Sequence, residues 1–128
     1  MKTAFVALVL LALCACAAST RHAITLPSGE DVLVLSESDQ SFVNVSHVKK
    51  HIFAVDYISA YDMDDIPALR KEASEVFDYY RERIDKGGFT TVGLAPMARV
   101  AGSPGPRDLY GRPIVFERGA DGQWMMQP

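Results

Sequence analysis

The stretch DMDDIPALRKEASEVFDYYRERIDKGG, residues 62–88, decides the fold of this sequence. Apolar side chains recur in it every three or four residues, which places them on one face of an α-helix. The members of this apolar stripe are Ile66, Leu69, Ala73, Val76, Phe77, Tyr80 and Ile84. Charged side chains fill the opposite face, where residues four apart carry opposite charges. A long helix with a single apolar stripe needs a flat apolar surface to cover, and we expect that surface to be a β-sheet.

Both ends of the predicted helix carry recognisable signals. Asp64 or Asp65 can accept hydrogen bonds from the free amides of the first turn, and Pro67 suits the first helical position. The pair Gly87-Gly88 offers the left-handed conformation that often ends a helix. We therefore predict one long helix over about residues 65–86.

The segment before the helix favours strands. Residues 23–26 and 32–35 alternate and flank a tight turn, so they predict a hairpin. The polar run SESDQ, residues 36–40, is interpreted as a turn. Residues 42–45 and 52–61 are again rich in strand-forming side chains.

The segment after the helix also favours strands. Residues 89–94 predict a strand, which would complete a β-α-β unit if it pairs beside residues 52–61. Residues 112–118 and 123–126 flank an Asp-Gly turn and predict a second hairpin.

These elements together predict one small α+β domain over residues 16–128. We expect a two-layer sandwich, with a mostly antiparallel or mixed sheet of about five to seven strands and the long helix packed on one face. An irregular loop is expected over about residues 96–111, because AGSPGPRD at 101–108 is too rich in glycine and proline for regular structure.

The first residues have the composition of an export signal. Lys2 supplies a positive charge, and an apolar run follows from residue 4 to residue 18. That run is shorter than the roughly 20 residues that a membrane-spanning helix needs. We therefore predict a signal peptide over residues 1–15 that is removed on export.

The end of this leader carries the motif Leu13-Cys14-Ala15-Cys16. It resembles the bacterial lipoprotein signal, in which a leucine stands three positions before the cysteine and a small residue stands just before it. The resemblance implies cleavage before Cys16, lipid attachment to Cys16 and, with Ala17 next, an outer-membrane lipoprotein facing the periplasm. General secretory cleavage after residue 17 or 18 stays open, and would give a soluble periplasmic or secreted protein. No resemblance is recognised for the rest of the chain.

Cysteine usage and charge narrow the chemistry of the exported domain. No cysteine follows Cys16, so the domain has neither a disulfide nor a cysteine metal site and is stabilised by its core. The formal net charge is -3, and losing Lys2 with the leader makes it more acidic. This balance argues against nucleic acid as a partner. Contact with a membrane is expected only through a lipid anchor at Cys16.

His47 and His51 are the weak candidates for a metal site. Histidines four apart can bind zinc together when they share one face of a helix. Their flanks favour strands instead, and Lys49 and Lys50 between them would repel a cation. We interpret the segment as a hairpin bend and predict no metal and no cofactor.

No catalytic constellation is recognisable in the sequence. There is no Gly-x-Ser-x-Gly elbow and no phosphate-binding loop that ends in Lys-Ser or Lys-Thr. The aspartates at the helix start are explained by capping. No catalytic residue is therefore named, and the enzyme hypothesis stays open without a site.

Aromatic side chains supply the possible partner contacts. Tyr79 falls beside the apolar stripe of the helix, and it could form a contact surface with Tyr57, Tyr61 and Tyr110. Trp124 lies in an apolar run that is either sandwiched or exposed at an edge. The first hypothesis is a small binding or accessory protein of the cell envelope with an unknown envelope protein or ligand as partner. The alternatives are a small-ligand or metal carrier domain and a hydrolase-type enzyme.

Overall fold

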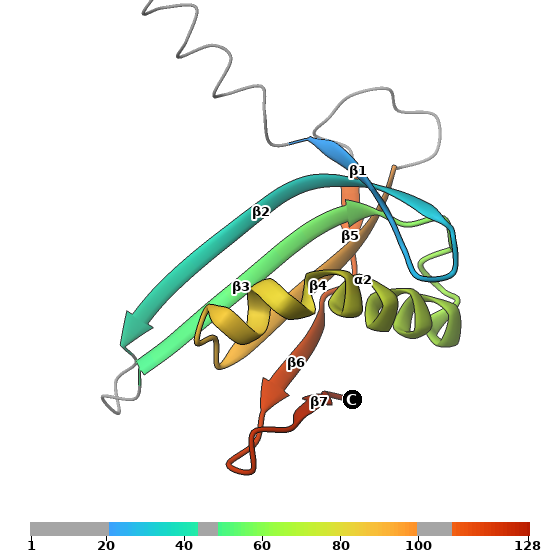
Figure 1. The fold of residues 1–128 in the computed structure, drawn as a ribbon. Coiled ribbons are helices and arrows are strands. Elements are labelled where there is room, and N and C mark those ends of the chain that lie inside the picture. The colour runs from blue at the N-terminus through green and yellow to red at the C-terminus, as the bar shows by residue number, and fades with distance from the viewer. Residues whose placement is uncertain (1–20, 44–48, 100–108) are drawn as a thin grey trace, which may run out of the picture.

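The computed structural model describes residues 21–43, 49–99 and 109–128. Its elements in chain order are β1 (His22–Thr25), β2 (Asp31–Val43), β3 (Lys49–Ile58), α2 (Ile66–Lys86), β4 (Thr91–Arg99), β5 (Leu109–Gly111), β6 (Ile114–Arg118) and β7 (Trp124–Met126). The strands form one mixed, seven-stranded sheet that is not closed, and α2 lies across one face of it (Figure 1). The predicted two-layer α+β fold is confirmed. Within the described ranges, no helix has the length and apolar character needed to cross a membrane.

The sheet is built around one parallel pair. The strand order is β1-β2-β3-β4-β6-β7, and β5 pairs with the far end of β4. β3 and β4 run parallel, with Phe53 opposite Val92 and Val55 opposite Leu94. Every other pairing is antiparallel. The segment β3-α2-β4 is therefore the predicted β-α-β unit, and the two predicted hairpins flank it as β1-β2 and β6-β7.

The helix begins and ends close to the predicted positions. Asp65 caps it and accepts a hydrogen bond from the amide of Ala68 at 3.3 Å. Ile66 holds the first helical position, so Pro67 stands second rather than first. At the other end Gly88 takes the left-handed conformation with φ of 67°, whereas Gly87 keeps an ordinary φ of −80°.

The core lies between α2 and the inner face of the sheet. The buried side of α2 carries Leu69, Glu72, Ala73, Val76, Phe77, Tyr80 and Ile84. Phe77 packs on Phe116 of β6 with ring centroids 4.6 Å apart, and Tyr80 meets Phe53 of β3 edge-on at 5.3 Å. These contacts remove the apolar stripe from water, which is the main source of stability for such a layer.

The polar run at residues 36–40 is not the turn that its composition predicts. It lies inside β2 and pairs with residues 52–56 of β3. Its polar side chains are accommodated because they have partners: Ser36 donates to Asp56 at 3.0 Å, and Asp39 pairs with His51 at 2.5 Å. β3 in turn begins at Lys49 and ends at Ile58, three residues earlier at each end than the predicted strand over 52–61.

Strands occupy both ends of the irregular loop predicted over residues 96–111. β4 continues to Arg99 and β5 begins at Leu109; the residues between lie outside the described part of the chain. Pro96 is tolerated inside β4 because the pairing of β4 changes there from β6 to β5. Its carbonyl accepts from the amide of Arg112 at 3.2 Å, in the gap between those two strands.

Candidate functional site

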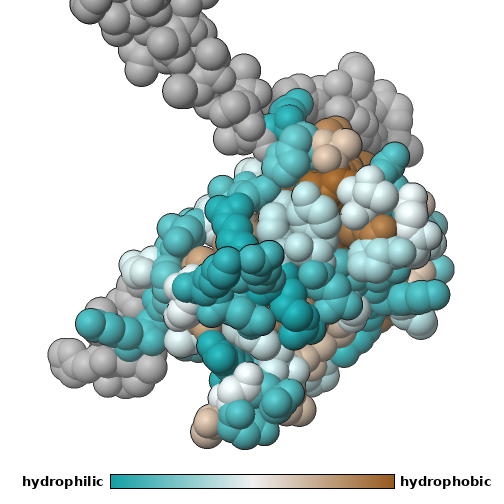
Figure 2. Space-filling model, viewed as in Figure 1, coloured by the Kyte–Doolittle hydropathy of each residue, from teal (hydrophilic) through white to brown (hydrophobic). Residues whose placement is uncertain are grey.

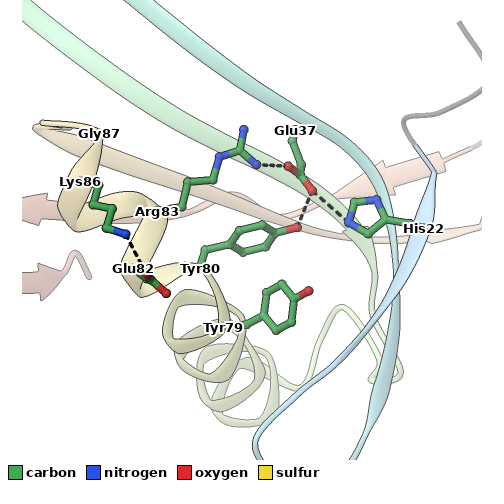
Figure 3. A pocket seen from close by; sticks show the side chains of 8 residues that line it. All are labelled: His22, Glu37, Tyr79, Tyr80, Glu82, Arg83, Lys86 and Gly87. Atoms are coloured by element: carbon green, nitrogen blue, oxygen red, sulfur yellow. Dashed lines mark hydrogen bonds and ion pairs between the residues drawn. The ribbon is translucent and has the colours of Figure 1, made fainter. Parts of the chain in front are cut away.

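A groove of about 690 Å³ runs between the C-terminal half of α2 and the strands β1 and β2. Its lining residues are His22, Glu37, Tyr79, Tyr80, Glu82, Arg83, Lys86 and Gly87. The helix supplies five of these residues, Gly87 follows its last residue, and the strands supply His22 and Glu37 (Figure 3). The face that α2 presents to solvent is mostly hydrophilic (Figure 2).

Glu37 organises the inner wall of the groove. Its carboxylate accepts a hydrogen bond from the Tyr80 hydroxyl at 2.8 Å and a further one from the Arg83 guanidinium. His22 Nε2 lies 3.1 Å from the same carboxylate (Figure 3). Glu37 thus ties β2 to the helix and to β1, and only 17% of its side chain is exposed.

Local irregularity in β2 places Glu37 on the helix side of the sheet. Val34 is buried on that side, and strict alternation would next bring Ser36 to it. The register shifts between Val34 and Ser36, so Glu37 rather than Ser36 lies opposite the buried Val55. An extra residue in one strand changes which side chains face the core, and such bulges occur often next to functional sites.

The two tyrosines of the groove have different roles. Burial raises the pKa of Tyr80 well above its usual value, and the hydrogen bond to Glu37 raises it further, so the phenol stays protonated and donates. Tyr79 is 47% exposed and contacts Tyr80 edge-on at 4.9 Å. Tyr79 therefore presents an aromatic side chain to the groove on a backbone that the Tyr80–Glu37 contact holds in place (Figure 3).

Cations of the groove are held by neighbours in the same molecule. Arg83 contacts Glu37, and its Cζ lies 4.8 Å from the centre of the Phe53 ring. Lys86 pairs with Glu82 at 2.8 Å. Because Arg83 is fixed on an aromatic face and a half-enclosed carboxylate, this part of the groove is formed before any partner arrives.

Of the three predicted contact residues, Tyr79 alone lines this groove. Tyr110 lies on β5 and is 48% exposed. Trp124 lies on β7, toward the opposite edge of the sheet from β1, and packs edge-on against Phe77 at 5.6 Å. Tyr57 is fully buried in the core, so it does not join the aromatic contact surface expected from the sequence.

His51 lies on β3, which begins at Lys49, so residues 49–51 belong to a strand and not to the hairpin bend expected over 47–51. Its Nε2 is 2.5 Å from Asp39 of β2, and its ring lies 4.4 Å from that of Phe89. His47, the other weak metal candidate, falls outside the described residues. Residues 21–43, 49–99 and 109–128 contain no group of three or more His, Cys, Asp and Glu side chains able to hold a metal. Cys16 also lies outside the described part.

Glu72 is the polar residue that sequence reasoning missed. It stands in the middle of α2 with 1% of its surface exposed, and its carboxylate accepts from the Ser59 hydroxyl at 2.6 Å and the Ala60 amide at 3.3 Å. Burial raises the pKa of this carboxyl, and the two hydrogen bonds oppose the rise. Its position could have been noticed, since it lies three residues after Leu69 and four before Val76, within the spacing of the apolar stripe.

A second, smaller recess of about 280 Å³ lies near the start of α2. Arg70 and Arg112 border it, with Ile66, Leu69 and Ile114 as apolar lining. Arg70 donates to the carbonyl of Gln127 at 3.1 Å, so this guanidinium fixes the segment after β7. We assign the recess a structural role in holding that segment against the helix.

The fold and the groove define an α+β domain with an open groove between its helix and the strands β1 and β2. Comparison of the sequence and structure with protein-family models, curated proteins and solved structures finds no match.

Proposed function

We propose that this chain is a small exported protein of the bacterial cell envelope that binds a partner through the groove between α2 and β2. The observation that carries the proposal is the construction of the groove. Its wall is fixed by the contacts of Glu37 with Tyr80 and Arg83, while Tyr79 stays exposed beside it. A preformed surface with an exposed aromatic side chain loses little conformational entropy on binding.

The shape of the groove favours a macromolecular partner over a small molecule. Small-molecule sites are concave and enclose most of the surface of their ligand. The groove of this domain is open along its length and is bordered by charged side chains of α2. The accessory-protein hypothesis is therefore supported over the carrier hypothesis.

The leader supports an address outside the cytosol. The Leu13-Cys14-Ala15-Cys16 motif favours lipid attachment at Cys16, and several acyl chains on one residue would anchor the domain firmly. Only residues 17–21 would then separate the anchor from β1, a reach of at most about 20 Å at roughly 3.5 Å per residue. His22 lines the groove, so a partner in or on the same membrane lies within reach of it.

The binding proposal is tested by affinity capture from envelope extract with the processed protein. Wild type, Tyr79→Ala and Tyr110→Ala are compared, because these tyrosines are almost equally exposed, at 47% and 48%, and only Tyr79 lines the groove. We expect one protein to be enriched by wild type and by Tyr110→Ala, and to be reduced at least about tenfold with Tyr79→Ala, as for an interface hot spot. Equal capture by all three proteins, or enrichment by none, would contradict the proposal.

The address is tested by labelling cells with a radioactive fatty acid. We expect label on the wild-type chain and none on Cys16→Ala. Label that persists in Cys16→Ala excludes Cys16 as the lipid site. If the wild-type chain carries no label and is cleaved after residue 17 or 18, the protein is exported in a soluble form and not anchored by lipid.

A further inference from the structure

We infer that the groove and the adjoining edge of β2 receive an extended segment of another protein, which pairs with β2 as an added strand and carries basic side chains. The inference rests on the groove being the binding site and names the class of its occupant. Strand addition gives affinity through main-chain hydrogen bonds and specificity through alternate side chains.

The outer edge of β2 is covered along only part of its length. β2 extends from Asp31 to Val43, and β1 pairs with it between Asp31 and Val34. Among the described strands, none pairs with that side of β2 beyond Val34, and Figure 1 shows β2 running well past β1. A strand edge of this kind offers unpaired backbone groups to another chain.

The hydrogen bonds of the neighbouring strand β3 show which backbone groups of β2 face this edge. The amide of His51 donates to the Thr90 hydroxyl and its carbonyl accepts from the Thr90 amide, so both groups point away from β2. Backbone groups alternate along a strand, so those of Ile52 point toward β2, where Gln40 lies opposite. The backbone groups of Gln40 and its alternate neighbours are thus used within the sheet.

The remaining residues of β2 present their backbone groups to the free edge. Among them are Glu37, Asp39 and Ser41. The side chains of the same three residues lie on the helix side of the sheet, opposite Val55, Phe53 and His51. A strand added at this edge would therefore direct alternate side chains to the helix side of the sheet, where Glu37 lines the groove.

Charge selects the kind of segment that fits. The uncovered part of β2, SESDQSFV, carries Glu37 and Asp39 and no cation. Inside the groove the charges balance, because Glu37 pairs with Arg83 and Glu82 pairs with Lys86. The excess formal negative charge lies along the edge at Asp39, which contacts the ring of His51 and is 55% exposed. A second copy paired through the same edge would bring the carboxylates of this edge near one another, which is unfavourable, whereas lysine or arginine at alternate positions of the added strand complements them.

The inference is tested by amide hydrogen exchange, measured by NMR on the processed protein with a blocked peptide Thr-Lys-Val-Lys-Val-Lys-Thr as probe. The amides of Glu37, Asp39 and Ser41 are expected to exchange freely without the peptide and to gain at least about tenfold protection with it. Those of Ser38 and Gln40 are expected to be protected throughout. The same peptide with glutamate in place of lysine is expected to give no protection.

Two variants make the test specific. Ser41→Pro removes one outward amide, which an edge position tolerates, and is expected to abolish the effect of the peptide; Ser41→Ala keeps the amide and is expected to retain it. Asp39→Lys changes the charge of the edge and is expected to shift preference toward the glutamate peptide. This second variant decides the question if Ser41→Pro fails to fold.

Four results would overturn strand addition. The first is that the three outward amides are protected without peptide at every protein concentration. That result would mean that the segment of this chain before β1 already pairs with the edge. Protection that grows with protein concentration assigns it to a second copy. The third is no protection by the lysine peptide, and the fourth is binding that neither variant alters. In each case a partner captured through Tyr79 would still support the proposed function, so the two failures are distinguishable.

Discussion

Glu72 is a carboxylic acid side chain buried among the apolar residues of the core. A carboxylate with 1% exposure is costly to keep charged, and Ser59 and Ala60 compensate that cost in part by hydrogen bonding. Burial is the largest cause of its raised pKa, and the nearby carboxylates of Glu30 and Glu75 raise it further. The folded domain therefore holds a proton at Glu72 more tightly than the unfolded chain does.

This predicts a defined dependence of stability on pH. Because the folded pKa of Glu72 lies above the usual value of 4.5, the stabilising effect of its proton is complete below that value. The effect is lost as pH rises through the folded pKa. In the wild type we expect the free energy of unfolding to fall as pH rises from mildly acidic to slightly alkaline. In Glu72→Gln we expect this fall to be smaller, as measured by urea denaturation across that range.

The control for this experiment is Glu82→Gln, which changes the same residue type on the same helix at a side chain that is 82% exposed. It is expected to follow the wild-type pH profile. Identical pH profiles for wild type and Glu72→Gln would show that Glu72 does not carry the effect.

Sequence reasoning at the residue scale succeeded where the environment is local. Tyr79 was expected beside the apolar stripe, and it is exposed there, since helical spacing alone sets its direction. Tyr57 could not be placed in the same way. Its burial depends on α2 crossing β3, a contact between segments that the sequence does not order in space.

At the scale of the elements, Gly87 and Gly88 follow α2 and look equivalent in sequence, but their structural environments differ. Gly88 has a φ of +67° and nothing within 4 Å of an added Cβ, so Gly88→Ala meets only backbone strain, about 1 kcal/mol. At Gly87 an added Cβ would come within 2.1 Å of the ring of Phe89, which is 3% exposed and stays in the core.

We therefore predict that Gly87→Ala destabilises the domain more than Gly88→Ala, although only Gly88 has a left-handed backbone. Overpacking of a core side chain typically costs about 1–3 kcal/mol. Chemical denaturation of both variants measures the order, with Gly93→Ala as the control because its Cβ would enter open space. A larger loss for Gly88→Ala would contradict the packing argument.

The sequence predicted α2 correctly because the residues that indicate a helix are close to one another in the sequence. The cap, the apolar spacing and the glycine pair are all local. The turn predicted over the polar half of β2 is wrong because the partners of these residues are distant in sequence. Glu37, for example, is held by Tyr80 and Arg83, more than forty residues later. The groove was missed for the same reason.

The whole domain depends on its core, since no cysteine follows Cys16. Phe77 joins α2 to the last hairpin through its contacts with Phe116 and Trp124. We predict that Phe77→Ala lowers the unfolding free energy by about 3–5 kcal/mol, the usual cost of truncating a buried aromatic residue. Trp124, the single tryptophan, allows unfolding to be followed by fluorescence.

Tyr79→Ala is the matched variant, two positions along the same helix at an exposed side chain. It is expected to change the unfolding free energy by about 0.5 kcal/mol or less. Similar losses for the two variants would mean that Phe77 does not join the helix to the last hairpin as described.

At the scale of the molecule, the sequence predicted the two layers but not the strand order, and it gave the parallel pair only on the condition that residues 89–94 pair beside residues 52–61. The β-α-β unit was predictable because one helix separates two strand-forming segments. The placement of β5 at the far end of β4 was not, because three residues in a segment rich in glycine and proline carry no strand signal of their own.

The parallel pair at the centre of the sheet has a consequence for how the chain matures. The ribosome releases a polypeptide from its N-terminus, so the residues of β1, β2 and β3 emerge before those of α2 and β4. During that interval no helix covers the apolar inner side of β3 and no strand pairs with its other edge, so we expect the nascent β1-β2-β3 segment to be the form of this protein most prone to aggregate. A chaperone that binds residues 22–58 until the rest of the chain has been synthesised would therefore reduce aggregation at this stage.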